Sequence, residues 1–261
     1  MSKPDSARER LDGWLIIDKP LGRSSAQIVG RIKYLIKQVG CKLKVGHGGT
    51  LDPLATGVLP IAIGEATKTV AYVMDGRKAY RFTVKWGEAR DTDDAEGKVI
   101  ESSDKRPTKQ EIDANLGQFI GEISQMPPKF SAIKVSGQRA YALARANKEV
   151  TLQPRLVRIE QLILRNHDLE TATFDVICGK GTYIRSLASD LAVNLGTCGH
   201  VSALRRTASG PFTEDRAISL ESLESLVHSA PPSDYLLAIE TALDDIPALA
   251  LNAAQADHLK H

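Results

Sequence analysis

The sequence predicts a mixed α+β domain in which helices flank one sheet. Helical and strand patterns alternate irregularly along the 261 residues, and neighbouring strands form hairpins, which favours this class over a doubly wound parallel sheet. Hydrophobic residues make up 42% of the chain, as a globular core requires, and no apolar run reaches the roughly 18 residues of a membrane helix. The length allows one large domain, or one domain with a small appendage.

Five elements are expected in the N-terminal half of the chain. A short apolar run that ends at an Asp-Lys-Pro turn predicts the first strand. Ser24 and Ser25 are N-cap candidates for the helix that follows, whose apolar residues keep helical spacing. In chain order, the expected elements are a strand at 14–17, a helix at 26–39, a buried strand at 57–64, a helix at 65–74 and an alternating strand at 80–86.

The C-terminal half has equally local signals. Thr108 and Glu111 form a capping box behind Pro107, Gly196 is a helix-ending glycine, and Ser219 is an N-cap candidate. The expected elements are a helix from 107 to about 119, paired strands at 158–165 and 172–178, a helix that follows 181–185 and continues through 195, a strand at 200–208 and a helix at 220–227.

The segment 46–57, Gly-His-Gly-Gly-Thr-Leu-Asp-Pro-Leu-Ala-Thr-Gly, says most about function. Its carboxylate, Asp52, follows three glycines and directly precedes a proline, which pushes Asp52 toward an extended backbone. The glycines allow a bulky ligand to approach the main chain closely. The pattern predicts a carboxylate presented on a loop with the imidazole of His47 nearby, although composition alone favours an ordinary turn of Asp, Gly and Pro.

Residues 46–60 resemble the catalytic-loop motif of the TruB family, the bacterial tRNA pseudouridine-55 synthases. Other motifs of the family follow in the family order between about residues 13 and 226, and such a series is far more specific than one match. They are Asp18-Lys19-Pro20, Lys78-Ala79-Tyr80, Met126-Pro127-Pro128 with Ser131-Ala132 and Lys134, Arg139-Ala140-Tyr141, Gly181-Thr182-Tyr183-Ile184-Arg185 and Leu204-Arg205-Arg206. The chain departs from the family at Gly48, where threonine is usual, and glycine is expected to loosen the loop.

The resemblance implies a pseudouridine synthase fold, with a mixed, mostly antiparallel sheet, flanking helices and a central RNA-binding cleft. It implies an isomerase that flips the T-loop uridine at position 55 of tRNA, detaches the uracil from its ribose and rejoins it through carbon. This chemistry requires no redox cofactor and no metal, so none is expected. The expected partner is the T-arm stem-loop of tRNA.

The resemblance also assigns roles to single residues. Asp52 maps to the family's nucleophile, and Arg185 is expected to pair with it, because a guanidinium binds a carboxylate bidentately and favours its charged form. Tyr80 is expected to stack on the uracil and to take part in removal of the C5 proton. His47 is expected to fill the gap that the flipped base leaves. The remaining expected substrate-binding residues are Tyr183, Leu204 and Lys19.

Positive charge is expected to hold the RNA. Segment 125–153 interleaves basic and aromatic residues, which predicts an RNA clamp that begins as a loop and continues as a basic helix near 139–147. The expected clamp residues are Lys129, Lys134, Arg139, Arg145 and Lys148. A basic rim around the motif loop is also expected, with a solvated helix face as the alternative, from Arg31, Lys33, Lys37, Lys42, Lys44 and Lys68.

The chain is expected to contain a catalytic domain at 12–235, including the clamp insertion at about 125–153. Residues 236–261 are expected to form a linker and the start of a truncated C-terminal RNA-binding domain. The three cysteines lack metal-type spacing and leave one unpaired in any disulfide scheme, which predicts reduced thiols in the cytoplasm. A monomer is expected. The acidic run 91–97 lacks key positions of a calcium loop and is interpreted as a solvated turn.

Two other functions remain open from the residues themselves. A non-catalytic RNA-binding module would use the same basic residues and would tolerate Asp52→Asn. A two-carboxylate glycosidase would need a second acid about 5–10 Å from Asp52. Only Asp18 and Glu65 lie near in sequence, and neither stands in a catalytic pattern.

Overall fold

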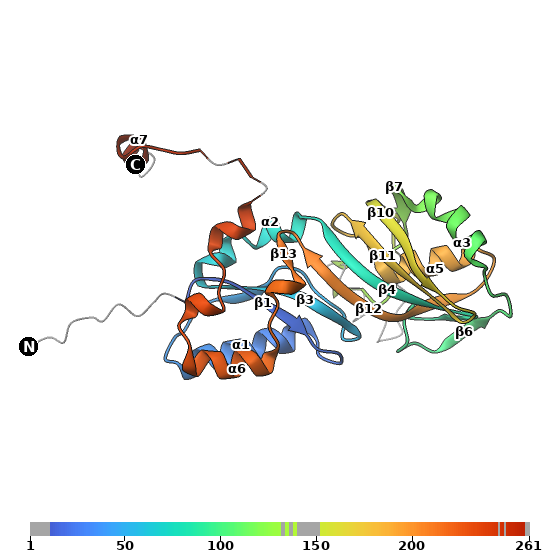
Figure 1. Cartoon of the computed structure of the whole chain (residues 1–261), viewed down its shortest axis with the longest axis horizontal. Helices are drawn as coiled ribbons and strands as arrows, with labels where there is room; N and C mark the ends of the chain where they lie inside the picture. Colours follow the sequence, from blue (N-terminus) through green and yellow to red (C-terminus); the bar gives the residue numbers. More distant parts are fainter. Residues whose placement is uncertain are drawn as a thin grey trace, which may run out of the picture.

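The structure is a computed structural model, which describes residues 11–131, 134–135, 138–139, 152–244, 246–247 and 249–258. Its centre is a nine-stranded sheet in the order β1-β3-β12-β4-β11-β10-β7, with β2 beside β3 and β13 beside β12 (Figure 1). The strands are β1 (Gly13–Lys19), β2 (Val45–His47), β3 (Ala55–Ile63), β4 (Lys78–Trp86), β7 (Gly121–Gln125), β10 (Arg155–His167), β11 (Thr171–Cys178), β12 (Gly199–Ser209) and β13 (Phe212–Thr213). Two ribbons lie outside it, β5 (Glu88–Arg90) with β6 (Val99–Ser102) and β8 (Lys134–Val135) with β9 (Gln138–Arg139).

One parallel contact makes the sheet mixed. Within the described residues every other strand pair is antiparallel, whereas β3 runs parallel to β12 from Ala55 opposite Leu204 to Gly57 opposite Arg206. The predicted α+β class with a mostly antiparallel sheet is therefore confirmed. The parallel contact places the start of β3, where the motif loop ends, against the middle of β12.

Helices cover the two halves of the sheet separately (Figure 1). Helices α1 (Ser25–Gln38) and α6 (Leu220–Ser229) share one hydrophobic core with β1 and β3. Helices α3 (Lys109–Asn115) and α5 (Ile184–Asn194) share a second core with β4, β10 and β11. Tyr80 and Leu204 pack against both cores. The seam between the cores therefore passes through β4 and β12 at two of the predicted site residues.

The helix starts follow the capping signals of the sequence. Ser24 and Thr108 each form a capping box, and the Ser219 side chain accepts from the N–H of Ser222. The helix expected at 65–74 is instead a 3₁₀ helix, η1 (Gly64–Lys68), followed by α2 (Val70–Asp75). The hydroxyls of Thr67 and Thr69 donate to the carbonyls of Gly64 and Ala66, and such local bonds compete with a regular α-helix.

Three of the six residues expected to form a basic rim around the motif loop lie away from Asp52. The N–H of Gly64 donates to the carbonyl of Lys44, so Lys44 lies at the far end of β3 from Asp52. The nine residues of β3 separate this end from the end near Asp52. Lys42 and Lys68 line a depression at that same distant end. Proximity in sequence was misleading here because an extended strand follows the loop.

The chain packs against the sheet beyond the expected domain boundary at 235. Leu237 exchanges both main-chain hydrogen bonds with Trp14 of β1, at 2.8 and 2.7 Å. The 3₁₀ helix η5 (Ile239–Leu243) follows, and Ala242 joins a third core with Trp14. The division at 235 remains a prediction. In the part of the chain that the structure describes, no helix has the length and apolar character to cross a membrane.

Candidate active site

The loop that carries Asp52, residues 48–54, is fixed by buried side chains from three elements. The Ser25 hydroxyl at the start of α1 donates to the carbonyl of Leu51 and accepts from its N–H, at 3.0 and 2.9 Å. The fully buried ammonium of Lys19, the last residue of β1, donates to the carbonyl of Pro53 at 3.3 Å. Arg206 of β12 donates to the carbonyl of Gly49 at 3.1 Å. We call residues 48–54 the Asp52 loop.

Two glycines of this motif meet a real steric need. Gly49 has φ of +132° and Gly57 has φ of +96°, a region that L side chains rarely adopt. A Cβ at Gly57 would also overlap the main chain of Arg206 on the neighbouring strand. Gly48 differs, because a Cβ there would lie 2.8 Å from Cγ1 of Val73. The expectation that Gly48 loosens the loop remains a prediction, and Val73 and Trp14 fill the space beside this glycine.

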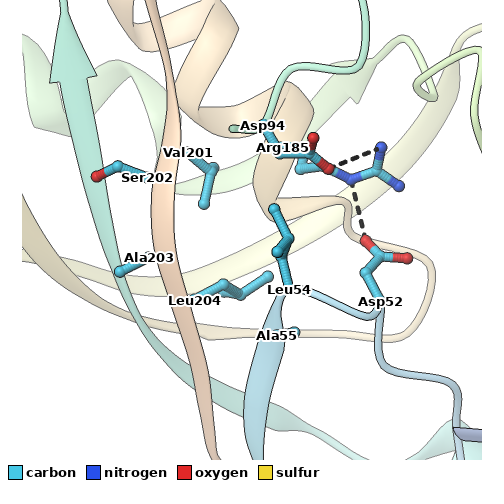
Figure 2. Close-up of a pocket in the computed structure, with 9 residues that line it drawn as sticks. All are labelled: Asp52, Leu54, Ala55, Asp94, Arg185, Val201, Ser202, Ala203 and Leu204. Carbon is cyan, nitrogen blue, oxygen red and sulfur yellow. Dashed lines mark ion pairs between the residues drawn. The ribbon is translucent and has the colours of Figure 1, made fainter. Parts of the chain in front are cut away.

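Asp52 forms an ion pair with Arg185, as the sequence predicts. The Arg185 Nε lies 3.0 Å from Oδ2 of Asp52, and Figure 2 shows the two side chains pointing toward each other at the pocket. The side chain of Arg185 is only 6% exposed, whereas that of Asp52 is 42% exposed. A buried cation thus holds a carboxylate that remains accessible to a ligand.

The other nitrogens of Arg185 tie three segments together. Nη1 donates to the carbonyl of Thr92 and Nη2 to that of Phe130, each at 2.9 Å. A second carboxylate, Asp94, places Oδ2 3.7 Å from Nη1 (Figure 2). The guanidinium therefore joins the Asp52 loop, the β5–β6 connection and the residues that lead into the clamp segment.

The acidic run 91–97 is a turn between β5 and β6, as the sequence predicts, and Asp91, Ala95 and Glu96 in it are exposed, but Asp94 is not solvated. Asp94 is buried, and its Oδ1 accepts from the Thr92 hydroxyl at 2.6 Å and from the N–H of Glu96 at 3.1 Å. The N–H of Val201 donates to the carbonyl of Asp93, which fixes the run against β12. Burial raises the pKa of Asp93, against a hydrogen bond from Ser189 and the charge of Arg185.

A small cavity separates Asp52 from β12. Its volume is about 10 Å³, which is space for about one water molecule. Its lining comprises Asp52, Leu54, Ala55, Asp94, Arg185, Val201, Ser202, Ala203 and Leu204 (Figure 2). A nucleobase would have to displace side chains or enter from the open side of Asp52. Among the described residues, no group of three or more His, Cys, Asp or Glu is arranged to hold a metal.

The two predicted tyrosines lie at the seam and at the start of α5. Tyr80 pairs with Arg206 across β4 and β12; burial raises its pKa, and Arg206 opposes the rise. Tyr183 is fixed by Gln125, which accepts from its N–H at 2.8 Å and donates to its carbonyl at 3.1 Å. Burial likewise raises the pKa of Tyr183, against a hydrogen bond from Ser131.

The remaining predicted residues lie at varying distances from this centre. His47 ends β2, opposite Ile61, and is half-buried rather than carried on the loop itself. Burial lowers the pKa of Lys19 to about 8, although the charge of Asp52 opposes this. Lys129 is exposed and close enough to Asp93 to influence its pKa. Lys134 and Arg139 pair in the β8–β9 ribbon, while Arg145, Lys148 and most of the expected helix at 139–147 lie outside the described residues.

Sequence reasoning missed Asp94, Ser25 and the role of Arg206. Arg206 stands in a recognised motif, and Ser25 was considered only as a cap. Nothing local to residues 91–97 indicates that they fold back onto Arg185, which lies about ninety positions later in the chain. The only available sequence signal for a role of Asp94 was its place directly after Thr92 and Asp93 in a connection between strands.

Two family models match the chain. The model of the TruB family pseudouridylate synthase N-terminal domain matches residues 36–184, and that of the tRNA pseudouridylate synthase B C-terminal domain matches residues 185–244. Among curated proteins, tRNA pseudouridine synthase B of Rhodospirillum rubrum is 56% identical over 256 residues, covering 96% of this chain and 80% of that protein. The same enzyme of Gluconacetobacter diazotrophicus is 54% identical, covering 96% and 81%.

Two solved structures of similar fold are a protein complex and a ribonucleoprotein. A Cbf5-Nop10-Gar1 complex contains a chain with a TM-score of 0.71 and 27% identity, covering 93% of this chain and 67% of that one. A chain of an H/ACA RNP bound to a substrate RNA containing 2'-deoxyuridine has a TM-score of 0.68 and 25% identity, with the same coverage.

Proposed function

The chain belongs to the TruB family of pseudouridylate synthases and isomerises uridine in tRNA to pseudouridine, and from this premise we propose its target and its catalytic residues. The target is the T-loop uridine at position 55, presented by the T-arm stem-loop. The observation that carries the catalytic part is the pairing of half-exposed Asp52 with buried Arg185. We also propose that the chain acts as a monomer.

Asp52 is the nucleophile at the junction of sugar and base. The reaction breaks the bond between uracil N1 and ribose C1′, turns the uracil and forms a bond from C5 to C1′. An attacking carboxylate must be ionised, and the adjacent guanidinium of Arg185 favours that form. Asp94 on the same guanidinium fixes its orientation, so that Nε remains directed at Asp52. Arg185 thus positions the carboxylate and stabilises its charge.

Tyr80, Tyr183 and Leu204 hold the uracil in the seam. Leu204 lines the cavity beside Asp52, and Tyr80 packs against both cores next to it. A base that stacks on an aromatic ring gains roughly 1–3 kcal/mol, which offsets part of the few kcal/mol that flipping costs. The ring of Tyr80 stacks on the flipped uracil, and its phenolate oxygen receives the C5 proton. His47, at the end of β2, fills the gap left in the T-loop, and Lys19 supports the Asp52 loop.

Lys129 and the clamp residues Lys134, Arg139, Arg145 and Lys148 contact phosphates of the T-arm. Lys129 is exposed and precedes Phe130, whose carbonyl accepts from Arg185. Phosphate contacts position an RNA without reading its sequence. RNA binding at Lys129 would therefore affect the position of the Arg185 guanidinium through the neighbouring residue Phe130.

The deciding experiment uses unmodified tRNA and a T-arm stem-loop, followed by mapping of any isomerised nucleotide. We expect pseudouridine at position 55 in both RNAs, no free uracil, and the same rate in the presence of EDTA. Asp52→Asn should abolish product while RNA binding is largely kept; Glu96→Gln, an exposed carboxylate of the β5–β6 connection, is the matched control. Turnover by Asp52→Asn would remove Asp52 from the mechanism, and free uracil would favour a glycosidase.

A further inference from the structure

Arg206 is a buried cation at the base of the site, with no role assigned so far. It is 1% exposed, which makes it one of the largest fully buried side chains of the protein. Nε donates to the carbonyl of Val58 at 2.7 Å, Nη2 to that of Gly49 at 3.1 Å and Nη1 to that of Thr50 at 3.5 Å. All three hydrogen bonds reach the segment that carries Asp52 or the strand that follows it.

The motif glycines adapt the loop to this guanidinium. A Cβ at Gly49 would lie 3.5 Å from Nη1 of Arg206, in a loop already held at φ of +132°. A Cβ at Gly57 would overlap the Arg206 main chain. Arg206 therefore approaches the Asp52 loop closely at two points, once through its side chain and once through its backbone.

The same guanidinium faces Tyr80. Arg206 and Tyr80 are directly opposite in the antiparallel β4–β12 pair, so their side chains lie on one face of the sheet. Burial raises the pKa of Tyr80, and the charge of Arg206 and its hydrogen bond to the phenol oppose that rise. One residue thus contacts both the loop of the nucleophile and the phenol.

The charge of Arg206 is costly where it stands. Among the described residues no carboxylate lies within ion-pair distance of it, and its hydrogen-bond acceptors there are main-chain carbonyls. Two buried lysines are close: burial, with a smaller contribution from the charge of Arg206, lowers the pKa values of Lys19 and Lys78 to about 8. Buried charges are normally paired, so this concentration of positive charge beneath Asp52 and Tyr80 indicates a functional role.

We propose that Arg206 is a positioning residue that holds the Asp52 loop and the Tyr80 hydroxyl in one frame and stabilises the Tyr80 phenolate that accepts the C5 proton. When the new bond from C5 to C1′ has formed, the phenolate takes the proton from C5. The C5–H electron pair forms the C5–C6 double bond, the electron pair of N1=C6 returns to N1, and N1 takes up a proton. This inference rests on the proposed function, and it adds the residue that allows Tyr80 to accept the C5 proton.

The test compares Arg206→Lys with Arg205→Lys in tRNA whose target uridine carries deuterium at C5. Arg205 is the matched control, because it is the neighbouring arginine but pairs with Asp18 and Glu214. For Arg206→Lys we expect kcat to fall roughly 100-fold or more, the magnitude typical of lost acid–base catalysis, with KM within about twofold. The primary isotope effect on kcat should be larger for Arg206→Lys than for the native enzyme. The pH at which kcat increases should also be higher for this variant.

A second route perturbs the same contact from the loop. Gly49→Ala should reproduce the isotope effect in weaker form even if Arg206→Lys folds poorly. In a Tyr80→Phe background, Arg206→Lys should add little, because residues that act as one unit are not additive. The proposal is overturned if both variants lose activity only in proportion to their folded fraction, or if neither the isotope effect nor the pH profile changes. Inactivity of the native protein on tRNA would instead overturn the proposed function.

Discussion

At the scale of single residues, the site depends on where positive charge is buried. Arg185 contacts the Asp52 loop through the carboxylate, and Arg206 contacts it through the main chain. Arg185 has two carboxylates for its charge, whereas Arg206 has carbonyl acceptors. The two arginines therefore act on different groups: Arg185 acts on the Asp52 carboxylate, and Arg206 acts on the main chain of the Asp52 loop and on Tyr80. Substitutions should separate these contributions.

Asp94→Asn should lower kcat by roughly 10-fold or more while KM for tRNA stays near its native value, because Asp94 orients Arg185 and does not touch the RNA. Single-turnover kinetics would measure the chemical step directly. Asp91→Asn, in the same connection but exposed, is the control and should retain activity. Unchanged single-turnover rates for Asp94→Asn would show that Arg185 is held well enough by the carbonyls of Thr92 and Phe130.

Lys19 makes the unfolding free energy depend on alkaline pH. Its pKa is about 8 in the folded state and 10.5 when unfolded, so between these values the unfolded chain binds more protons. Stability should therefore rise with pH across this window, since the strain of a buried charge is relieved as Lys19 deprotonates. Urea denaturation from pH 7.5 to 10 should show a steeper rise for the native protein than for Lys19→Met. Parallel curves would contradict the lowered pKa.

At the scale of elements, the glycine at the start of β3 controls how the loop meets the sheet. Gly57 stands in the parallel contact with Arg206, which belongs to the only parallel pair of named strands among the described residues. Its φ of +96° and the absence of a Cβ let β3 and β12 approach. The position of Asp52 relative to the seam thus depends on one backbone conformation.

Gly57→Ala should destabilise the protein by about 1–3 kcal/mol or more and abolish activity, because alanine is strained at this φ and its Cβ overlaps Arg206. Chemical denaturation and a tRNA assay would measure both. Gly30→Ala is the control: Gly30 lies in α1 with nothing within 4 Å of its Cβ position, and alanine there should stabilise by about 0.5–1 kcal/mol. Equal changes of stability and activity in the two variants would contradict the proposed overlap between a Cβ at position 57 and Arg206.

Helix boundaries were the most predictable elements. Ser24, Thr108 and Ser219 each cap a helix where the sequence placed a cap, because capping depends on residues only three positions apart. The interruption at Thr69 was not predictable from apolar spacing, since it arises from competition between hydroxyl and main-chain hydrogen bonds. Local sequence signals therefore predicted where helices begin better than they predicted whether a helix continues without interruption.

At the scale of the whole molecule, the two hydrophobic cores meet at Tyr80 and Leu204. The proposed clamp is connected to the site through Phe130, whose carbonyl accepts a hydrogen bond from Arg185. RNA affinity should fall with salt, with a log–log slope of about −0.7 for each phosphate contact on a single strand. The catalytic step, in contrast, uses buried ion pairs that salt screens weakly. Binding and chemistry should therefore respond differently to ionic strength.

Lys129→Ala should weaken binding of the T-arm stem-loop and reduce the magnitude of that slope by about 0.7, while kcat at saturating RNA stays near its native value. Fluorescence titration from 50 to 300 mM salt would measure the slope. Lys109→Ala on α3, where Lys109 pairs with Asp113, is the control for loss of one surface charge. An unaltered slope in Lys129→Ala would place Lys129 outside the RNA contact.

The sequence by itself determined the family, the α+β class and the pairing of Asp52 with Arg185, because the motifs combine residue types that few other constraints would require together. It could not determine that Asp94 returns to Arg185, that Lys42, Lys44 and Lys68 lie at the far end of β3 from Asp52, or that Arg206 joins the loop to Tyr80. Only tertiary structure decided these relations, because strand order and register bring distant segments together, and neither is encoded in the residues adjacent to any one of them.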